Sequence, residues 1–600
     1  MNPIPRQHGP RQPRPRRALL GTVALAASLG LILAGCGSEG GANVNTSGEG
    51  AEAGEPQAGG DLTVLLDAGY SGGWDTGLDP ATSNSVGANQ SLNSAIFGGL
   101  FTLEADENGE NAEIVPQQAE GYEFSEDGLT LTVTLREGIT FSDGTALDAE
   151  AVVWNWIRNL SSGSTGAPQL DLDLERPMPE LDQEFLDDLY AALPEDVDQG
   201  LIEQRLGAIQ AVDEHTVQLH LATANGALVN AMPYNNLNLI GSPTAYQEQG
   251  AQEFSRAPVA AGPFTVEANR ISERLDLERN EDYFKEGLPY LDELSFQSIA
   301  GDQVMYQTLQ AGQGDAIEGL SSLTLIQQAQ SNPQVTTTLG APTSPYVIQL
   351  NTRQAPFDEK KAREAIYYAT DFEAINEGLF GGQADLSQSF TASGGLFHEP
   401  EVEGYRTYDP EKAAELVEEI GGLTVELGTT DIVTARQVTT ALQTQWQEAG
   451  IDVTIDSKPL GDVITKFGTG QWESMLQTAG AWDPAAGIGV GVRFGSTSTY
   501  SGTPLPEGAA TAAEALEGGL QTDLDRVIQD AAATVDEQER GELYRQAAEM
   551  ISDEAYGPFG IAFSPAQVVR EGVHGPGLTT PIPALAVNPG VIYERVWVEQ

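Results

Sequence analysis

Basic residues and cysteine are scarce in this sequence of 600 residues. Lys and Arg number 29 against 88 Asp and Glu, which gives a formal net charge of −59. Nucleic-acid binding depends on clustered Lys and Arg that displace counterions from phosphates, so the composition excludes a nucleic-acid partner. Cys36 is the only cysteine, which excludes an intrachain disulfide and a Cys-based metal site. The length of 600 residues allows more than one globular unit. The share of 40% apolar residues is ordinary for a globular protein and too high for a disordered acidic chain.

Acidic residues are absent from residues 1–35, which hold five arginines. A basic stretch at residues 14–17 precedes an apolar run at residues 18–35, and Cys36 follows directly. A basic end and a short apolar run are typical of a secretory signal, because a spanning helix needs about 20 apolar residues. The residues LAGC, which end at Cys36, resemble the bacterial lipobox, whose cysteine is lipidated and becomes the N-terminus after cleavage. We therefore expect a lipoprotein signal peptide at residues 1–35; the alternative is a retained membrane anchor beside an incidental cysteine.

Residues 36–60 are rich in Gly, Ala and Glu and contain no aromatic residue. Such a segment cannot bury a core, which indicates a flexible tether. A lipidated Cys36 and this tether would hold the remaining chain outside the cell, anchored to the outer face of the cell membrane. Without residues 1–35 the chain carries 24 basic and 88 acidic residues, a net charge of −64.

Helix and strand signals alternate through the remaining chain. Residues 129–135, LTLTVTL, alternate apolar side chains with Thr, the period of a half-buried strand. Residues 434–449 place apolar side chains at steps of three and four, which predicts a helix that ends before Gly450. The next residues, 451–455, alternate as a strand again. Since no repeat of about 20–50 residues is present, the pattern predicts an α/β chain with more than one lobe.

Five segments carry family-like patterns in a fixed order: IVPQQAE at residues 114–120, LREGITFSDGTALDAEAVVW at 135–154, GPF with LERN and DYF within 262–284, NTRQAPFDEKKAREAIYYATD at 351–371, and YDPEKA at 408–413. Together they resemble the extracytoplasmic solute-binding proteins of ABC importers, specifically the oligopeptide/dipeptide-binding family, family 5. The chain departs from the family pattern at Ala151, where Asp is usual, at Phe264, where Tyr is usual, and at Ala260-Ala261, where Gly-Thr is common.

The resemblance implies an α/β fold of two lobes, a periplasmic-binding-protein clamshell with a hinge of two chain segments and an enlarged N-terminal lobe. Lobe 1 is expected at residues 61–345 and 563–600, and lobe 2 at residues 346–562. Residues 340–345 and 563–565 are rich in Pro, Gly and Ser, which suits linkers between lobes. In this family the ligand is captured between the lobes, and closure is a hinge motion.

The implied function is that of a lipid-anchored, monomeric receptor, which captures an oligopeptide or dipeptide and delivers it to the permease and ATPase subunits of an ABC transporter. Alternatives are the same fold with another solute, such as an oligosaccharide, an opine or a metal chelate, and a lipid-anchored hydrolase. The sequence has no H-E-x-x-H and no Gly-Lys phosphate loop, so we expect no enzyme. The acidic residues 171–198 lack the spacing of a calcium loop, and we expect neither a metal nor a cofactor.

The main candidate for the ligand site is the segment 480–484, GAWDP. In peptide-binding relatives a Trp-led segment here supplies an Asp that pairs with the α-ammonium of the peptide. The resemblance thus assigns Trp482 to the cleft and Asp483 to the amine of the ligand, through a charge-assisted hydrogen bond of about 1.5–3 kcal/mol. The family usually separates the Trp from this Asp, so the alternative is a turn-forming Asp483 with Trp482 in the core.

Three further residues are candidates for ligand contact. Tyr70 and Trp74 lie in a Gly-rich segment after the expected first strand, at residues 62–66. The corresponding loop of the family borders the cleft, where aromatic side chains give apolar contact; the alternative is packing in the core. Arg493 precedes a polar segment and would meet a carboxylate of the ligand, whereas the alternative is a solvated Arg.

Overall fold

A computed structural model describes the chain at residues 55–66, 74, 76–83, 90–105, 112–162, 170–194, 196–340, 342, 344–479, 487–581 and 590–600. Contacts within the chain separate Met1–Asn45 from Thr46–Gln600, and every described residue belongs to the second part. The expected signal peptide and Cys36 lie outside the described residues. Within the described part, no helix combines the length and the apolar character that crossing a membrane requires.

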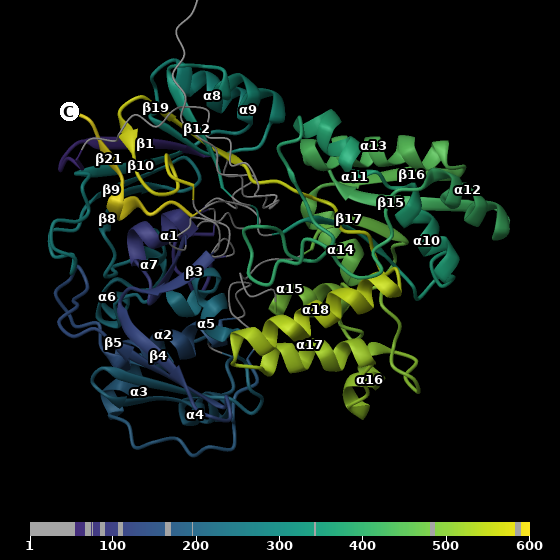
Figure 1. Cartoon of the computed structure of the whole chain (residues 1–600). Coiled ribbons are helices and arrows are strands. Elements are labelled where there is room, and N and C mark those ends of the chain that lie inside the picture. The colour runs from purple at the N-terminus through teal and green to yellow at the C-terminus, as the bar shows by residue number, and fades with distance from the viewer. Residues whose placement is uncertain are drawn as a thin grey trace, which may run out of the picture. The chain divides into compact units, whose positions relative to one another are not determined.

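A seven-stranded sheet forms the centre of lobe 1, in the order β12-β19-β11-β1-β10-β9-β8 (Figure 1). Strand β1 lies parallel to both neighbours, β10 and β11, and the outer strand pairs are antiparallel. On one face, alternate side chains of β1 pack with helix α1 and the C-terminal residues. On the other face, α8 and α9 cover the sheet. The bounds are β1 Asp61–Leu66, α1 Gln90–Phe97, β8 Phe264–Arg270, β9 Arg274–Arg279, β10 Glu293–Ser298, α8 Asp302–Gln310, β11 Ala316–Leu320, α9 Leu323–Gln330, β12 Val335–Leu339 and β19 Ala566–Arg570.

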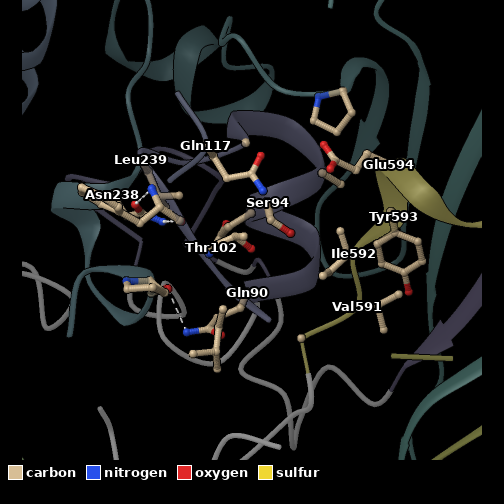
Figure 2. A pocket seen from close by; sticks show the side chains of 18 of the residues that line it. Gln90, Ser94, Thr102, Gln117, Asn238, Leu239, Val591, Ile592, Tyr593 and Glu594 are labelled. Carbon is tan, nitrogen blue, oxygen red and sulfur yellow. Dashed lines mark hydrogen bonds between the residues drawn. The ribbon is translucent and has the colours of Figure 1, made fainter. Parts of the chain in front are cut away.

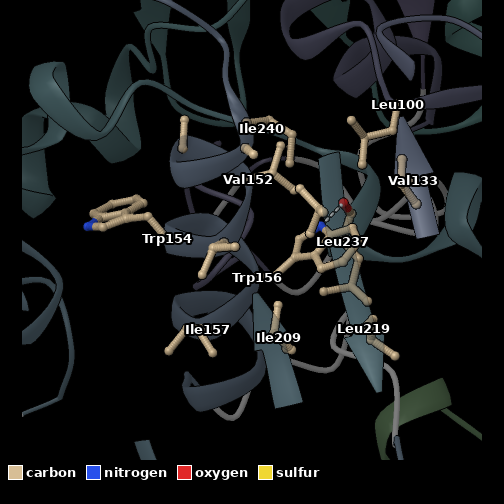
Figure 3. Close-up of a cluster of buried hydrophobic side chains, with 14 of the residues drawn as sticks. Leu100, Val133, Val152, Trp154, Trp156, Ile157, Ile209, Leu219, Leu237 and Ile240 are labelled. Carbon is tan, nitrogen blue, oxygen red and sulfur yellow. Dashed lines mark hydrogen bonds between the residues drawn. The ribbon is translucent and has the colours of Figure 1, made fainter. Parts of the chain in front are cut away.

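Residues between β1 and β8 build a second core, which enlarges lobe 1. The sheet β4-β5-β7-β6 packs against helix α2, and Figure 3 shows the buried side chains between them. Helix α2 begins after Asp148, whose carboxylate accepts a hydrogen bond from the Ala151 N–H at 2.9 Å. The bounds are β2 Phe101–Ala105, β3 Ala112–Pro116, β4 Ala119–Phe124, β5 Thr130–Leu135, α2 Ala149–Ser161, α3 Gln183–Ala191, α4 Gln199–Ala208, β6 Ile209–Asp213, β7 Thr216–His220, α5 Leu228–Ala231, η1 Met232–Tyr234, η2 Asn236–Asn238, α6 Pro243–Gln249 and α7 Ala251–Arg256.

A four-stranded sheet, in the order β13-β17-β15-β16, forms the centre of lobe 2. Helices α10, α12 and α13 pack on one core, and α15, α17 and α18 on another. The predicted helix at 434–449 is α13, Val433–Glu448, and it ends before Gly450, whose φ of +83° suits glycine. The other bounds are β13 Tyr346–Leu350, α10 Lys360–Ala369, α11 Phe372–Ile375, η3 Asn376–Phe380, β14 Asp385–Leu386, α12 Pro410–Glu419, β15 Leu423–Thr430, β16 Ile451–Lys458, α14 Leu460–Gly468, β17 Ser474–Thr478, α15 Gly487–Phe494, α16 Ala512–Gly518, α17 Asp523–Ala533 and α18 Glu537–Asp553.

The chain passes between the two large sheets twice. It leaves the first sheet after β12 and enters the second at β13, and it returns from the short strand β18, Ile561–Ala562, to β19. Phe563 in the returning segment packs against Phe380, with ring centroids 5.2 Å apart. The last elements, β20 Val573–His574, η4 Tyr593–Arg595 and β21 Trp597–Val598, pack on lobe 1. The exact boundaries of the lobes stay a prediction, which these two crossings support.

Candidate functional site

Four residues on neighbouring strands form a row across the seven-stranded sheet of lobe 1. The row lies at the end of the sheet where the chain leaves for lobe 2 and where it returns. In β1 and β11 Leu66 pairs with Glu318, and in β12 and β19 Thr338 pairs with Gln567. The pairing of β11 with β19 is irregular between Ile317 and Leu320, so Gln567 lies opposite this irregularity. Ligands of open α/β sheets bind beyond the carboxyl ends of the parallel strands. The row therefore marks the edge of the sheet at which a ligand is expected.

Glu318 is a buried acid within this row. Its two carboxylate oxygens accept hydrogen bonds from the Ser91 hydroxyl and, at 2.9 Å, from the Tyr593 hydroxyl. The Ser91 hydroxyl in turn accepts a hydrogen bond from the Val591 N–H at 2.9 Å. Burial raises the pKa of Glu318 to about 7, although both hydroxyl donors act to lower it. Glu318 thus joins β11 to α1 and to the C-terminal residues.

Gln567 is the neighbouring polar residue, and it is 1% exposed. Among the described residues, neither its amide nitrogen nor its amide oxygen has a hydrogen-bond partner. A buried polar group that lacks a hydrogen-bond partner lowers the stability of the fold by about 1–3 kcal/mol. A polar residue at such a position therefore suggests a function other than stability. A primary amide donates and accepts hydrogen bonds at once, which matches the peptide groups of a peptide ligand.

Arg493 is the predicted site residue that the structure describes in lobe 2. It lies in α15 and is buried, so its solvated alternative is wrong. The guanidinium donates from Nε to the Thr478 carbonyl at 3.2 Å, and its Cζ lies 5.6 Å from the centroid of the Phe467 ring. Burial lowers the pKa of Arg493 to about 10, while Tyr500 acts to raise it. The side chain is therefore still a cation at neutral pH, and it lies inside lobe 2.

Trp74 is the predicted site residue that the structure describes in lobe 1. Its side chain is 1% exposed and packs in the core between the seven-stranded sheet and α1. The indole N–H donates to the Asn269 side-chain oxygen at 3.0 Å. Trp74 thus has a packing role in this structure, and its contact with a ligand stays a prediction. Tyr70, Trp482 and Asp483 lie outside the described residues.

A small pocket of lobe 1 lies between α1 and the C-terminal residues (Figure 2). Its volume is about 70 Å³, the space of a few water molecules. Two of its lining side chains bind each other, since the Tyr283 hydroxyl donates to the Glu594 carboxylate, and Lys285 contacts the same carboxylate at 2.8 Å. Burial and the adjacent Glu594 raise the pKa of Tyr283, which keeps its hydroxyl protonated. Tyr283 and Glu594 thus attach the C-terminal residues to the segment that follows β9.

The two sheets joined by two crossings give the two-lobed α/β fold that the resemblance implies. The chain belongs to the bacterial extracellular solute-binding proteins, family 5, whose model matches residues 113–500. It is accordingly a substrate-binding protein of ABC importers, which work with permease and ATPase subunits, and it is not an enzyme. The predicted family and the predicted two-lobed α/β fold are confirmed.

The chain is similar to the following proteins over most of its length. The glutathione-binding protein GsiB of Salmonella paratyphi A is 27% identical over 494 residues, which cover 80% of this chain and 85% of that protein. Among solved structures, DppA of Helicobacter pylori in complex with the peptide STSA has a TM-score of 0.63 at 20% identity, covering 91% of this chain and 99% of that one. AgaA of A. tumefaciens R10 in complex with agropinic acid has a TM-score of 0.64 at 21% identity, covering 90% and 99%.

Sequence reasoning missed Glu318 and Gln567. Each is the one strongly polar residue of an otherwise apolar strand, AIEGL in β11 and AQVVR before the terminal Arg in β19. A polar residue at a position where the pattern demands an apolar one is a signal that could have identified both. Their proximity could not have been identified, because it depends on the return of the chain from lobe 2.

Proposed function

We infer that this protein is a lipid-anchored receptor that captures a dipeptide or oligopeptide between its lobes and delivers it to an ABC permease. The observation that carries the peptide assignment is the relationship to a glutathione-binding protein over 80% of the chain. Glutathione is itself a small peptide. The fold of DppA, which was solved with a bound peptide, covers 91% of the chain and supports the same ligand class.

The candidate residues together supply the chemistry that a peptide requires. Asp483 pairs with the α-ammonium group, and Arg493 with a carboxylate, because opposite charges in a desolvated site form the strongest hydrogen bonds. Trp482 and Tyr70 give apolar contact to side chains of the peptide. Gln567 offers a donor and an acceptor to a peptide group. The net charge of −64 on residues 36–600 disfavours the approach of strongly acidic solutes.

An opine is the second candidate ligand, since the fold of AgaA, solved with agropinic acid, also covers 90% of the chain. The two ligand classes are separated by thermal-shift measurements on the purified protein with di- to pentapeptides, glutathione, agropinic acid and maltooligosaccharides. A ligand that binds the folded state raises the melting temperature by mass action. We expect peptides to do so. A shift with agropinic acid or a sugar and none with any peptide contradicts the peptide assignment, and turnover of the ligand in a mass spectrum contradicts a receptor.

The role of Asp483 is tested by Asp483→Asn, with Asp452→Asn as the control on an exposed position of the same lobe. Loss of the charge-assisted hydrogen bond is expected to weaken peptide binding roughly tenfold or more, since such bonds contribute about 1.5–3 kcal/mol. Calorimetric titration with a stabilising peptide and with its N-acetylated form measures this. Wild-type affinity in Asp483→Asn, or an equal loss for both peptides, contradicts the pairing with the α-ammonium.

A further inference from the structure

The turn between α17 and α18 in lobe 2 approaches lobe 1 far from the two crossings. The Gly226 N–H of lobe 1 donates to the Ala532 carbonyl of α17 at 2.8 Å. Gly226 precedes α5, and Figure 1 shows α17 beside α5. This backbone hydrogen bond joins the two lobes directly. It requires that the two backbones come into contact, since no side chain mediates it.

Gly226 leaves no room for a side chain in this arrangement. A Cβ atom at position 226 would lie 2.0 Å from the Thr534 carbonyl oxygen and 2.8 Å from the Val535 Cα. Together with the Thr534 carbonyl carbon, these are the nearest atoms, and all belong to lobe 2. Gly226 does not have a positive φ, so its own backbone conformation is open to other residues. The contact with lobe 2, and not the folding of lobe 1, therefore demands glycine here.

Other residues of lobe 1, Gly128 and Tyr122, also lie close to the α17–α18 turn and α18 of lobe 2. A Cβ at Gly128, in the turn between β4 and β5, would lie 3.2 Å from a methyl group of Val535. Tyr122 of β4 lies near α18: burial raises the pKa of its hydroxyl, Glu537 of α18 adds to the rise, and Arg540 acts to lower it. The hydroxyl of Tyr122 thus stays neutral at physiological pH. One backbone hydrogen bond of about 1 kcal/mol and a few apolar atoms make a reversible contact.

We propose that Gly226 is the contact residue of a closure latch, in which the α17–α18 turn docks on lobe 1 and favours the closed form of the protein. A ligand held between two lobes binds with an apparent affinity that scales with the fraction of protein able to close. A side chain at position 226 holds the turn away from lobe 1 and so weakens ligand binding without touching the ligand. The effect on affinity rests on the proposed function, whereas the contact between the lobes does not.

The test compares Gly226→Ala and Gly226→Val with Gly121→Ala, whose added Cβ would meet no atom within 4 Å. Dyes are attached through unnatural amino acids at Val212 of lobe 1 and Leu516 of lobe 2, which are 54% and 66% exposed. Single-molecule energy transfer then measures the closed fraction of the whole protein, alone and with glutathione or the peptide STSA. We expect both Gly226 variants to need about tenfold more probe for half-closure, with an unchanged melting temperature and with Gly121→Ala behaving as wild type.

Each other outcome has a defined meaning. The latch is overturned if wild type and Gly226→Ala have equal closed fractions with and without probe. It is also overturned if the dyes of the wild-type protein never come as close as the structure places Val212 and Leu516. A lower melting temperature of both Gly226 variants without probe also overturns it, because the glycine then serves the fold of lobe 1. The last outcome is that neither probe increases the closed fraction of the wild type, but without probe the wild type is closed more often than Gly226→Ala. The latch is then supported, and the peptide assignment loses support.

Discussion

At position 318 an acidic side chain lies within an apolar strand and meets two hydroxyl groups, of Ser91 and Tyr593. Removal from water favours the neutral acid, which is why its pKa is raised from 4.5 to about 7. The folded chain therefore binds this proton more tightly than the unfolded chain does. Between pH 4.5 and 7, the folded state carries more protons at this site, and its stability falls as the pH rises.

Glu318→Gln should remove this dependence, because an amide of nearly the same shape does not titrate. We expect the free energy of unfolding of wild type to decrease by up to about 3 kcal/mol from pH 4.5 to pH 7.5 relative to that of Glu318→Gln, because a pKa raised from 4.5 to about 7 changes the stability by about 1.36 kcal/mol per pH unit between these values. Urea unfolding of both proteins at several pH values measures the difference. Parallel curves for the two proteins across this range would show that folding does not raise the pKa of Glu318.

The same residue shows where prediction from sequence ends. Glu318 and Gln567 belong to strands that are separated by the whole of lobe 2, and they become neighbours only because β19 pairs with β11. Hydrophobic periodicity reports which face of a strand is buried, but not which strands pair after a long excursion. For Arg493 the sequence predicted a polar role, while burial within α15 depends on the packing of lobe 2 and was not predicted.

Helix α2 carries two tryptophans, which lie in different surroundings although both are buried. The Trp156 indole N–H donates to the Leu237 carbonyl at 2.7 Å, within the core shown in Figure 3. The Trp154 indole N–H has no partner among the described residues, and its ring packs edge-on against Tyr246, with centroids 5.4 Å apart. The helix thus offers two tryptophans of which Trp156 donates a hydrogen bond, whereas Trp154 has the Arg158 Cζ 5.4 Å from its ring centroid.

Replacement of each tryptophan by phenylalanine separates packing from hydrogen bonding. Both changes remove similar volume from the core, but Trp156→Phe also leaves the Leu237 carbonyl without this donor. We expect Trp156→Phe to lower the free energy of unfolding by roughly 1–2 kcal/mol more than Trp154→Phe does. Urea unfolding followed by circular dichroism gives both values. Equal losses would mean that the hydrogen bond stabilises lobe 1 no more than the contact of Trp154 with Arg158 does.

Elements with strong periodicity were predictable from the sequence. The expected strand at 129–135 is β5, and the strand expected at 451–455 begins at the predicted residue as β16. The acidic stretch 171–198, for which the sequence predicted no helix, contains α3, which Asp182 caps. Its amphipathic signal is short and is interrupted by acidic residues, so local pattern alone does not reveal the helix.

At the scale of the whole molecule, the sequence divides into a basic N-terminal segment and a strongly acidic remainder. The high net charge of one sign in the acidic remainder disfavours association between copies of the chain, because like charges repel. The described residues carry no spanning helix. For residues 1–36, lipidation at Cys36 and a retained apolar anchor are the two hypotheses of membrane attachment.

The two hypotheses predict different masses for the mature protein. If Cys36 is lipidated, the wild-type protein from a bacterial membrane should lack residues 1–35, which include all five arginines of the leader, and carry a lipid on its N-terminal cysteine. Cys36→Ser removes the thiol that accepts the lipid, so this variant should keep residues 1–35 and carry no lipid. Ser38→Ala, two positions beyond, is the control and should be processed like wild type. Intact-mass spectrometry reads all three results, and a wild-type mass that includes residues 1–35 without lipid identifies the apolar run as the anchor.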